Sequence, residues 1–352
     1  MSSEVLTAPA RRVAPLGVAM MLAALAFVVA GRAGPLGDIA ALETFVVIFA
    51  SIVIEALPFV LLGAAVSAAI EVFVSDAAFT RLGRLPVALQ LPAAAMSGVA
   101  FPVCECGSVP VARRLIARGM HPSAGIAFML ASPVLNPIVL LSTVVAYQGR
   151  GLATQMVLGR AGLGLVLAVV AGWAIGTGDA SELLRARPRD DHGHGDHGDA
   201  DDRADVADDH DHRPARPQRA RAFFDHLGND FFFMGRFVVL GGALAAVLQT
   251  VIPQSIVSGI ARTSIVGTLA LMGVAFVLSL CSEADAFVAV SFVQFPLGSQ
   301  LAFLVFGPVV DAKLAFLYGA TFRRRFVLRL IVVAVPVVLA GSLWFEALVA
   351  NR

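Results

Sequence analysis

Charged residues are scarce in this chain. Only 14% of its 352 residues are Asp, Glu, Lys or Arg, whereas 58% are hydrophobic. Typical soluble domains carry roughly a quarter charged residues. The deficit leaves too few polar side chains to cover a water-soluble globule of this length, so an ordinary soluble domain is excluded.

Other signatures are missing as well. The three cysteines are too few for a disulfide framework. No GxxxxGK[ST] motif is present, so ATP-driven pumping by this chain alone has no support. The net charge is +1, and no basic patch interleaved with aromatic residues suggests nucleic-acid binding. No motif requires a cofactor. Alternating strand segments of about ten residues are absent, which argues against an outer-membrane barrel.

Long apolar runs are present instead. About 20 apolar residues cross the hydrocarbon layer as a helix, and a helix satisfies its own backbone hydrogen bonds there. Runs with at most one charge lie at 13–30, 44–70, 85–103, 124–146 and 263–280. The sequence therefore predicts an all-α polytopic membrane protein in the lipid bilayer of the bacterial plasma (inner) membrane. The first run is expected to be a retained helix rather than a signal peptide.

A charged segment divides the hydrophobic chain into two parts. Residues 13–176 form a first transmembrane half and residues 223–350 a second, with a linker at 177–222 between them. Dense Asp, His, Arg and Pro leave this linker too little apolar surface to fold. The linker is interpreted as a soluble spacer, or else as a tract whose histidines are metal-binding candidates that buffer a metal ion. These histidines are His192, His194, His197, His210 and His212.

The two halves repeat several motifs in the same order. Cys104-Glu105-Cys106 in the first half matches Cys281-Ser282-Glu283 in the second. Matched glycines precede these motifs, and a mid-span proline, an arginine and a glycine follow them. The matched pairs are Gly63 and Gly241, Pro133 and Pro308, Arg160 and Arg329, and Gly172 and Gly341. The shared order indicates a duplication.

Arginine placement indicates that the two copies are inverted. Residues 112–120 carry three arginines and the equivalent 286–300 carry no charge, whereas 147–151 carry one arginine and the equivalent 321–326 carry three. Because Lys and Arg collect in cytoplasmic loops, this reversal predicts inverted repeats with a cytoplasmic N-terminus and linker. Residues 86–110 then enter and leave the membrane from the cytoplasmic side. A full crossing at 86–103 would instead place the linker outside.

The stretch FPVCECGSVP is predicted to be a broken or re-entrant helix. Pro102 and Pro110 each remove a backbone donor, and Gly107 permits unusual backbone angles. Irregular backbone at membrane depth is tolerated only where protein or water covers it. The residues at 104–106 are therefore expected to face an interior cavity. Thiolates there would select soft metals and metalloids, unless the cysteines are simply small packed hydrophobes.

A second pair of breaks is predicted at ASPVLNP (131–137) and FGPVVDAK (307–313). Each contains a mid-span proline, which frees the carbonyl four residues earlier. Asn136 and Asp311 occupy equivalent positions after these prolines. Lys313 is a partner for Asp311, because charges inside the membrane are normally neutralised. A mechanical helix kink is the alternative to a functional role.

These motifs yield two sets of candidate residues. We expect the substrate to be bound by Cys104, Glu105, Cys106, Asn136, Cys281, Glu283 and Asp311. We expect ion coupling to involve Glu55, Asp285 and Lys313, which also lie in or beside apolar segments. Arg160 is nearer to a span end, where its side chain can snorkel to the interface.

At these residues the sequence resembles the YraQ/ArsP family of predicted permeases. The resemblance rests on PVCECGSVPVARRLIARG (102–119) and AFMLASPVLNP (127–137), supported by FGPVVDAK. It covers nearly all of the hydrophobic chain but not the linker. It implies an inner-membrane permease; some relatives export trivalent organic arsenicals and others are linked to metal resistance. The linker is longer than in the shortest members, and its histidines fit a purely metalloid substrate poorly.

The sequence thus predicts a secondary transporter, and not an enzyme, that exports a small soft metalloid or metal species such as a trivalent organoarsenical. Buried carboxylates would couple its movement to protons. The alternative is a membrane thiol–disulfide electron carrier that uses Cys104, Cys106 and Cys281. Glu105 beside the thiols and the lack of a CxxC motif count against that alternative. The sequence is compatible with a homo-oligomer.

Overall fold

The computed structural model describes residues 37–74, 86–99, 103–178, 180–185, 216–251 and 264–350. Every regular element in these ranges is a helix, which confirms the all-α fold class. The β-type contact among them is an isolated antiparallel bridge between Leu184 and Phe322. The predicted first helix at 13–30, the five linker histidines and Pro102 lie outside the described residues.

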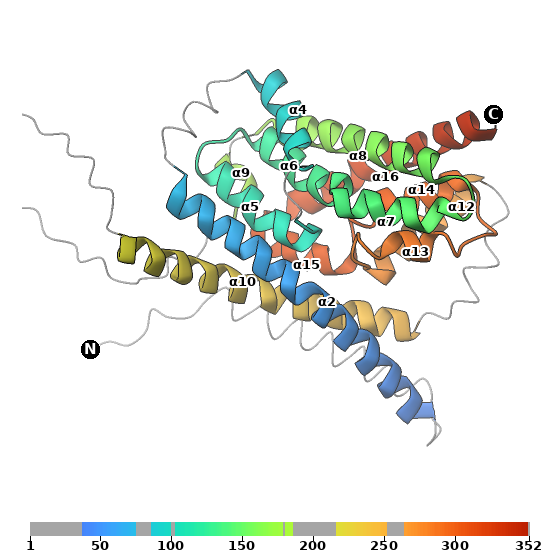
Figure 1. Ribbon diagram of the computed structural model, residues 1–352, viewed down its shortest axis with the longest axis horizontal. Helices are drawn as coiled ribbons and strands as arrows, with labels where there is room; N and C mark the ends of the chain where they lie inside the picture. The colour runs from blue at the N-terminus through green and yellow to red at the C-terminus, as the bar shows by residue number, and fades with distance from the viewer. Residues whose placement is uncertain are drawn as a thin grey trace, which may run out of the picture.

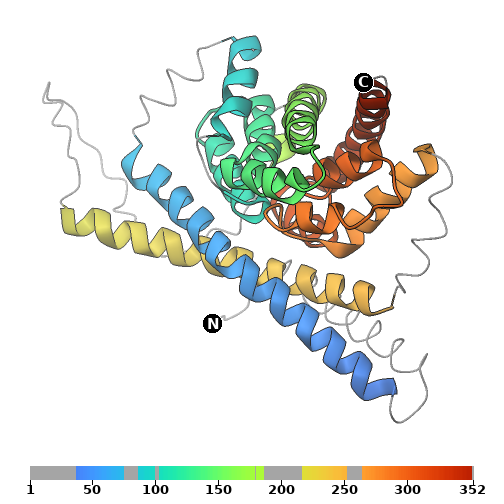
Figure 2. The ribbon, with the colours of Figure 1, turned by 45° about the vertical axis from the view of Figure 1, so that its right-hand side comes forward.

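Two long helices form a crossed pair along one side of the molecule. Helices α2 (Gly37–Phe73) and α10 (Arg216–Val251) pack along each other and occupy matching places in the two halves. Both views show this pair lying beneath the remaining helices (Figure 1 and Figure 2). The pair bears exposed large apolar side chains, among them Val47, Ile54 and Phe232. Such a surface is expected where a protein meets lipid.

The remaining helices follow the same order in both halves. The first half contains α4 (Val87–Ser97), α5 (Glu105–Ala117), α6 (Pro122–Leu135), α7 (Pro137–Gln148) and α8 (Ala153–Ile175), and the short α9 (Ala180–Leu183) follows. The second half contains α12 (Ser264–Leu278), α13 (Asp285–Ala289), α14 (Leu297–Phe306), α15 (Ala312–Thr321) and α16 (Arg324–Ala350). The packing repeats too, because α6 contacts α4 and α8 just as α14 contacts α12 and α16.

Five helical segments of the described chain are long and apolar enough to cross a membrane. They are Leu42–Phe73, Pro122–Gln148, Ala153–Ile175, Ala220–Thr250 and Arg325–Val349. The first two contain the apolar runs found in the sequence at 44–70 and 124–146. Helices α12 and α14 are apolar but shorter. The chain is therefore a multi-pass helical membrane protein, and the side on which each loop lies stays a prediction.

Both breaks predicted after the mid-span prolines are present, and a polar side chain caps the helix that follows each. Helix α6 ends at Leu135, and Asn136 Oδ1 accepts the Ile138 backbone N–H at 2.9 Å to begin α7. In the second half Asp311 Oδ1 accepts the Leu314 backbone N–H at 2.6 Å to begin α15. An N-cap oxygen satisfies a backbone donor that a new helix leaves free. The two aligned positions therefore have the same structural role.

The break at the cysteine motif lies further upstream than predicted. Helix α4 ends at Ser97, whereas α5 begins at Glu105 with Cys104 as its N-cap. Pro110 lies inside α5 and does not end it. A proline removes one backbone bond from a helix, but packing supplies most helix stability in proteins, and α5 is largely buried. The residues at 104–106 thus form a helix N-terminus rather than an irregular loop.

The matched glycines bring helices together at the centre of the molecule. A Cβ atom on Gly63 of α2 would meet the backbone of Gly107 in α5, and one on Gly241 of α10 would meet the backbone of Lys313 in α15. Small residues permit such close approach of two backbones within a membrane. Helices α5 and α15 are thereby seated directly on the crossed pair.

Candidate functional site

A buried ion pair joins the N-terminal ends of α5 and α15. Lys313 Nζ lies 2.7 Å from Glu105 Oε1, and the two side chains are 2% and 1% exposed. The pair links the two halves of the chain, because Glu105 belongs to the first and Lys313 to the second. Burying two charges is costly unless further hydrogen bonds complete the arrangement.

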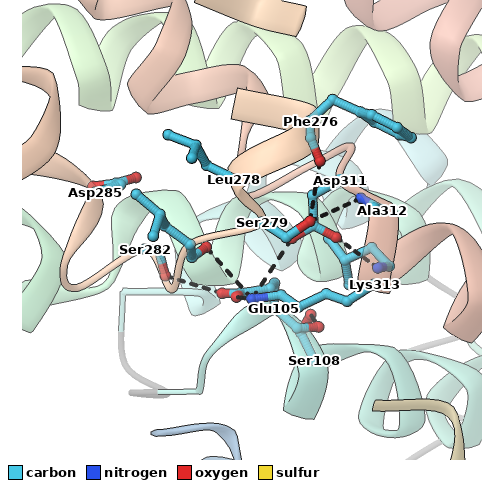
Figure 3. A network of polar contacts seen from close by, with 12 residues as sticks. Glu105, Ser108, Phe276, Leu278, Ser279, Ser282, Asp285, Asp311, Ala312 and Lys313 are labelled. Atoms are coloured by element: carbon cyan, nitrogen blue, oxygen red, sulfur yellow. Dashed lines mark hydrogen bonds and ion pairs between the residues drawn. The ribbon is translucent and has the colours of Figure 1, made fainter. Parts of the chain in front are cut away.

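Further hydrogen bonds surround the Glu105–Lys313 ion pair (Figure 3). Ser282 Oγ donates to Glu105 Oε2 at 3.1 Å, and Lys313 Nζ donates to the Leu280 carbonyl at 3.4 Å. Asp311 Oδ2 lies 3.6 Å from Lys313 Nζ, so the predicted pair between these residues is present. Glu105 is nevertheless the nearer carboxylate. One lysine therefore faces two carboxylates that come from different halves.

The three cysteines lie around this pair, and all are free and buried. Cys104 caps α5, Cys106 lies in its first turn, and Cys281 begins the turn before α13. Cys281 lies close enough to Cys106, Glu105 and Lys313 for their charges to act on its thiol. Cys104 is in turn close enough to Cys281 for the same effect. Sulfur from both halves is thus brought together, although no group of three or more His, Cys, Asp and Glu in the described residues could hold a metal ion.

Of the other predicted site residues, Glu283 and Glu55 lie near the Glu105–Lys313 pair, whereas Asn136 has no hydrogen bond with it in the structure described. Both carboxylate oxygens of Glu283 are buried without a hydrogen-bond partner, and the group is within electrostatic range of Glu105 and Glu55. Glu55 is half-buried in α2. Asn136 is 0% exposed, and its amide nitrogen has no hydrogen-bond partner. The side-chain oxygen of Asn136 caps α7 by accepting the Ile138 backbone N–H. This contact does not connect Asn136 with the Glu105–Lys313 pair.

The position of Arg160 near a span end would allow its side chain to snorkel to the interface, but the structure buries it. Its side chain is 0% exposed, and its guanidinium contacts both carboxylate oxygens of Asp285 at 2.8 and 2.7 Å. It also donates to Thr143 Oγ1 at 2.9 Å and to the Ser282 carbonyl at 3.2 Å. The place of Arg160 along its span does not reveal this carboxylate partner, because Asp285 belongs to the other half. Asp285, a predicted ion-coupling residue, is paired with this arginine.

A second polar cluster, which the sequence analysis missed, fixes the other end of α5. Arg114 contacts Glu71 of α2 and Asp230 of α10, each at 2.8 Å. Asp230 is 1% exposed and also accepts a hydrogen bond from Ser67 Oγ at 2.7 Å. Arg118 pairs with Glu71 at 3.2 Å. In the sequence the arginines after the cysteine motif indicate only the side of the membrane, but in the structure Arg114 and Arg118 also pair with carboxylates on α2 and α10.

These features define a class of protein. Broken helices bring buried charges and thiols together inside a multi-pass helical membrane protein, which is where permeases place their substrate sites. Residues 41–346 match the family model ArsP_1, described as a predicted permease. The chain therefore belongs to this family of predicted permeases, as the resemblance implied.

Two relatives cover most of the chain. The "UPF0718 protein YcgR" of Bacillus subtilis (strain 168) is 41% identical over 298 residues, which are 84% of this chain and 95% of the relative. The "Putative two-component membrane permease complex subunit" of Streptococcus mutans serotype c (strain ATCC 700610 / UA159) is 30% identical over 291 residues, 81% of this chain and 89% of the relative. No solved structure matches the chain. The family description and the name of the Streptococcus relative both indicate a membrane permease.

Proposed function

We propose that this chain is a secondary transporter of the inner membrane that exports a small soft metalloid or metal species, such as a trivalent organic arsenical. The main support is the placement of three free, buried cysteines from both halves around the Glu105–Lys313 pair. Thiolate sulfur prefers soft ions to hard ones. The substrate would be bound where the N-termini of α5 and α15 meet the turn at Cys281.

Substrate binding would require a movement at this site. In the described conformation the cysteines and nearby carboxylates do not form a group that could hold a metal ion. A soft substrate is therefore expected to draw the N-terminus of α5 toward the turn at Cys281. Transporters of this kind expose a midplane site to one side at a time by moving one repeat against the other.

The carboxylates around Lys313 would supply the coupling to protons. Glu105 and Asp311 share this one lysine, and Glu283 has no hydrogen-bond partner. Because charges inside a membrane need compensation, a proton or a cationic substrate would balance the excess negative charge. Glu55 lies within electrostatic range of Glu283 and would take part in the same exchange.

We further infer that the two halves are inverted repeats. Inversion places loops 112–120 and 321–326 on one side of the membrane and loops 147–151 and 286–300 on the other. Arg185 lies between the first two loops, because its carbonyl accepts from Arg113 at 3.0 Å and its backbone N–H donates to the Thr321 carbonyl at 3.0 Å. Arg150 donates to the Val290 carbonyl at 2.6 Å and so links the other two.

The packing of the half-helices supports the same inference. Helix α5 of the first half packs against α15 of the second, and α13 of the second packs against α7 of the first. This exchange of equivalent partners is what a pseudo-two-fold axis would produce. The axis would lie in the membrane plane if the copies are inverted.

A sensitivity panel in a deletion strain tests the proposed substrate class. Complementation with the full chain should restore resistance to a trivalent organic arsenical, and a Cys104→Ser/Cys106→Ser/Cys281→Ser variant of equal abundance should not. Serine keeps the size of the side chain but is not a soft ligand. The proposal fails if the chain restores resistance to no soft metal or metalloid. Copurification with a second membrane protein would show whether this chain, like the named Streptococcus relative, acts as a subunit.

A further inference from the structure

Arg160 joins the first half to the turn that carries Cys281. Helix α8 supplies this arginine, and its two terminal nitrogens bind both oxygens of Asp285 at the start of α13. One of them also binds the Ser282 carbonyl. On the other side Thr143 of α7 accepts a hydrogen bond from Arg160 and donates its own to Val139. The turn at 281–285 is thus held against α7 and α8.

This turn leads directly to the central ion pair. Ser282, whose carbonyl accepts from Arg160, donates its hydroxyl to Glu105 Oε2 at 3.1 Å. The other oxygen of Glu105 accepts from Lys313 at 2.7 Å. The contacts from Ser282 through Glu105 to Lys313 are visible in Figure 3. A continuous chain of contacts therefore connects Arg160 with the site proposed to bind the substrate.

The repeat does not duplicate this arrangement. Arg329, which the aligned motifs match to Arg160, has an exposed side chain on α16. Ser108, at the place matched to Asp285, donates to the carbonyls of Glu105 and Met129 within its own half. In the described part of the chain, the turn at Cys281 is thus fixed to the opposite half in a way that its counterpart at Cys104 is not.

We propose that Arg160 is a positioning residue of the transport site. It clamps the turn at 281–285 to the first half, so that Cys281 and Ser282 keep their places while the Glu105–Lys313 contact opens and closes. A planar guanidinium suits this task because its fork fixes a carboxylate in two places at once. We call the contacts of Arg160 with Asp285 and Ser282 the clamp. Its role in transport rests on the function proposed above, whereas its existence is tested without substrate.

The clamp is tested by the reactivity of Cys281. An Arg160→Gln/Asp285→Asn variant removes both charges together, which avoids leaving one of them buried without a partner. We expect N-ethylmaleimide to modify Cys281 of the full chain in membranes roughly fivefold faster or more, as measured by peptide mass spectrometry. That factor corresponds to a loss of about 1 kcal/mol of local stability. Modification of Cys104 and Cys106 should change little.

Two further variants keep the test decisive. Arg329→Gln removes the matched arginine and should leave the reactivity of Cys281 unchanged. Thr143→Val keeps the ion pair but removes one contact of Arg160, and should give a smaller increase; it decides the matter if the double variant does not insert. The clamp is refuted if N-ethylmaleimide modifies Cys281 of the inserted double variant at the parental rate. If the double variant does not insert, the same result in Thr143→Val refutes it.

A transport measurement separates positioning from a general structural role. Arg160→Lys keeps the charge but loses the two-point contact, so it should insert normally and raise the KM for a trivalent organic arsenical. Parental KM in Arg160→Lys would contradict a positioning role. If the parent chain transports no such compound, the function proposed above fails, while the change in Cys281 reactivity still decides whether the clamp exists.

Discussion

The Glu105–Lys313 contact is a single pair of residues that joins the two halves at the centre of the molecule. Neither residue has water to compensate its charge, since both are almost fully buried. In the transport cycle proposed above, the strength of this ion pair would depend on what else is bound nearby. A proton on Glu105, or a cation beside it, would weaken the contact with Lys313 and so favour another conformation.

Lys313→Met should destabilise the protein strongly. The variant leaves Glu105 buried without its partner, which costs about 3–5 kcal/mol for ion pairs of this kind. A lower midpoint of thermal unfolding in detergent, measured on the purified protein, would show this loss. The Glu105→Gln/Lys313→Met double variant should recover most of the stability but not transport. A single variant as stable as the parent would mean that the ion pair contributes little to the fold.

At the scale of helices, α5 and α15 depend on the crossed pair beneath them. Gly63 and Gly241 let the two half-helices approach α2 and α10 backbone to backbone. Arg114 then fixes the far end of α5 through Glu71 and Asp230. The site is therefore seated on α2 and α10 through contacts at both ends of α5.

Gly63→Ala and Gly241→Ala should each destabilise the protein. The added methyl group would overlap backbone atoms of Gly107 or Lys313, and overpacking of this kind costs about 1–3 kcal/mol. Gly162→Ala in α8 is the matched control, because a Cβ there meets nothing within 4 Å. It should be neutral or slightly stabilising, since Ala favours a helix over Gly by up to about 1 kcal/mol. Equal thermal midpoints for all three variants would argue against the close contacts.

The sequence predicted elements better than it predicted partners. The breaks at Asn136 and Asp311 were found because a mid-span proline followed by a capping side chain is a local signal. Lys313 and Glu105 are separated by 208 positions, and Arg160 and Asp285 by 125. Nothing local indicates which buried acid meets which base across two halves. For the same reason the sequence did not predict the contact of Ser282 with Glu105, although the two residues occupy aligned positions.

At the scale of the whole molecule, the inverted arrangement predicts the side of each loop. Single cysteines introduced at Gly149 and Val293 should react with a membrane-impermeant maleimide in intact cells. One introduced at Arg323 should react only after the cells are opened. The native cysteines are buried and can be followed separately by peptide analysis. Reaction of positions 149 and 293 from opposite sides of the membrane would show that the repeats are not inverted.

The charged linker is predicted to be dispensable for the transport step. Its composition cannot form a packed core, and its histidines are expected to buffer a metal ion rather than to carry it across. Deletion of residues 190–212 should therefore leave a membrane-inserted protein with the same transport rate in vesicles. Normal insertion with complete loss of transport would assign the histidines a direct part in transport.

The central claim is that cysteines from both halves bind a soft substrate during export. Uptake of a trivalent organic arsenical into everted membrane vesicles, driven by an imposed proton gradient, tests this claim most directly. Vesicles with the parent chain should accumulate the compound, and vesicles with equal amounts of the Cys104→Ser/Cys106→Ser/Cys281→Ser variant should lose most of that uptake. Uptake by the triple variant at the parental rate would contradict the claim, because the cysteines would then be packing residues only.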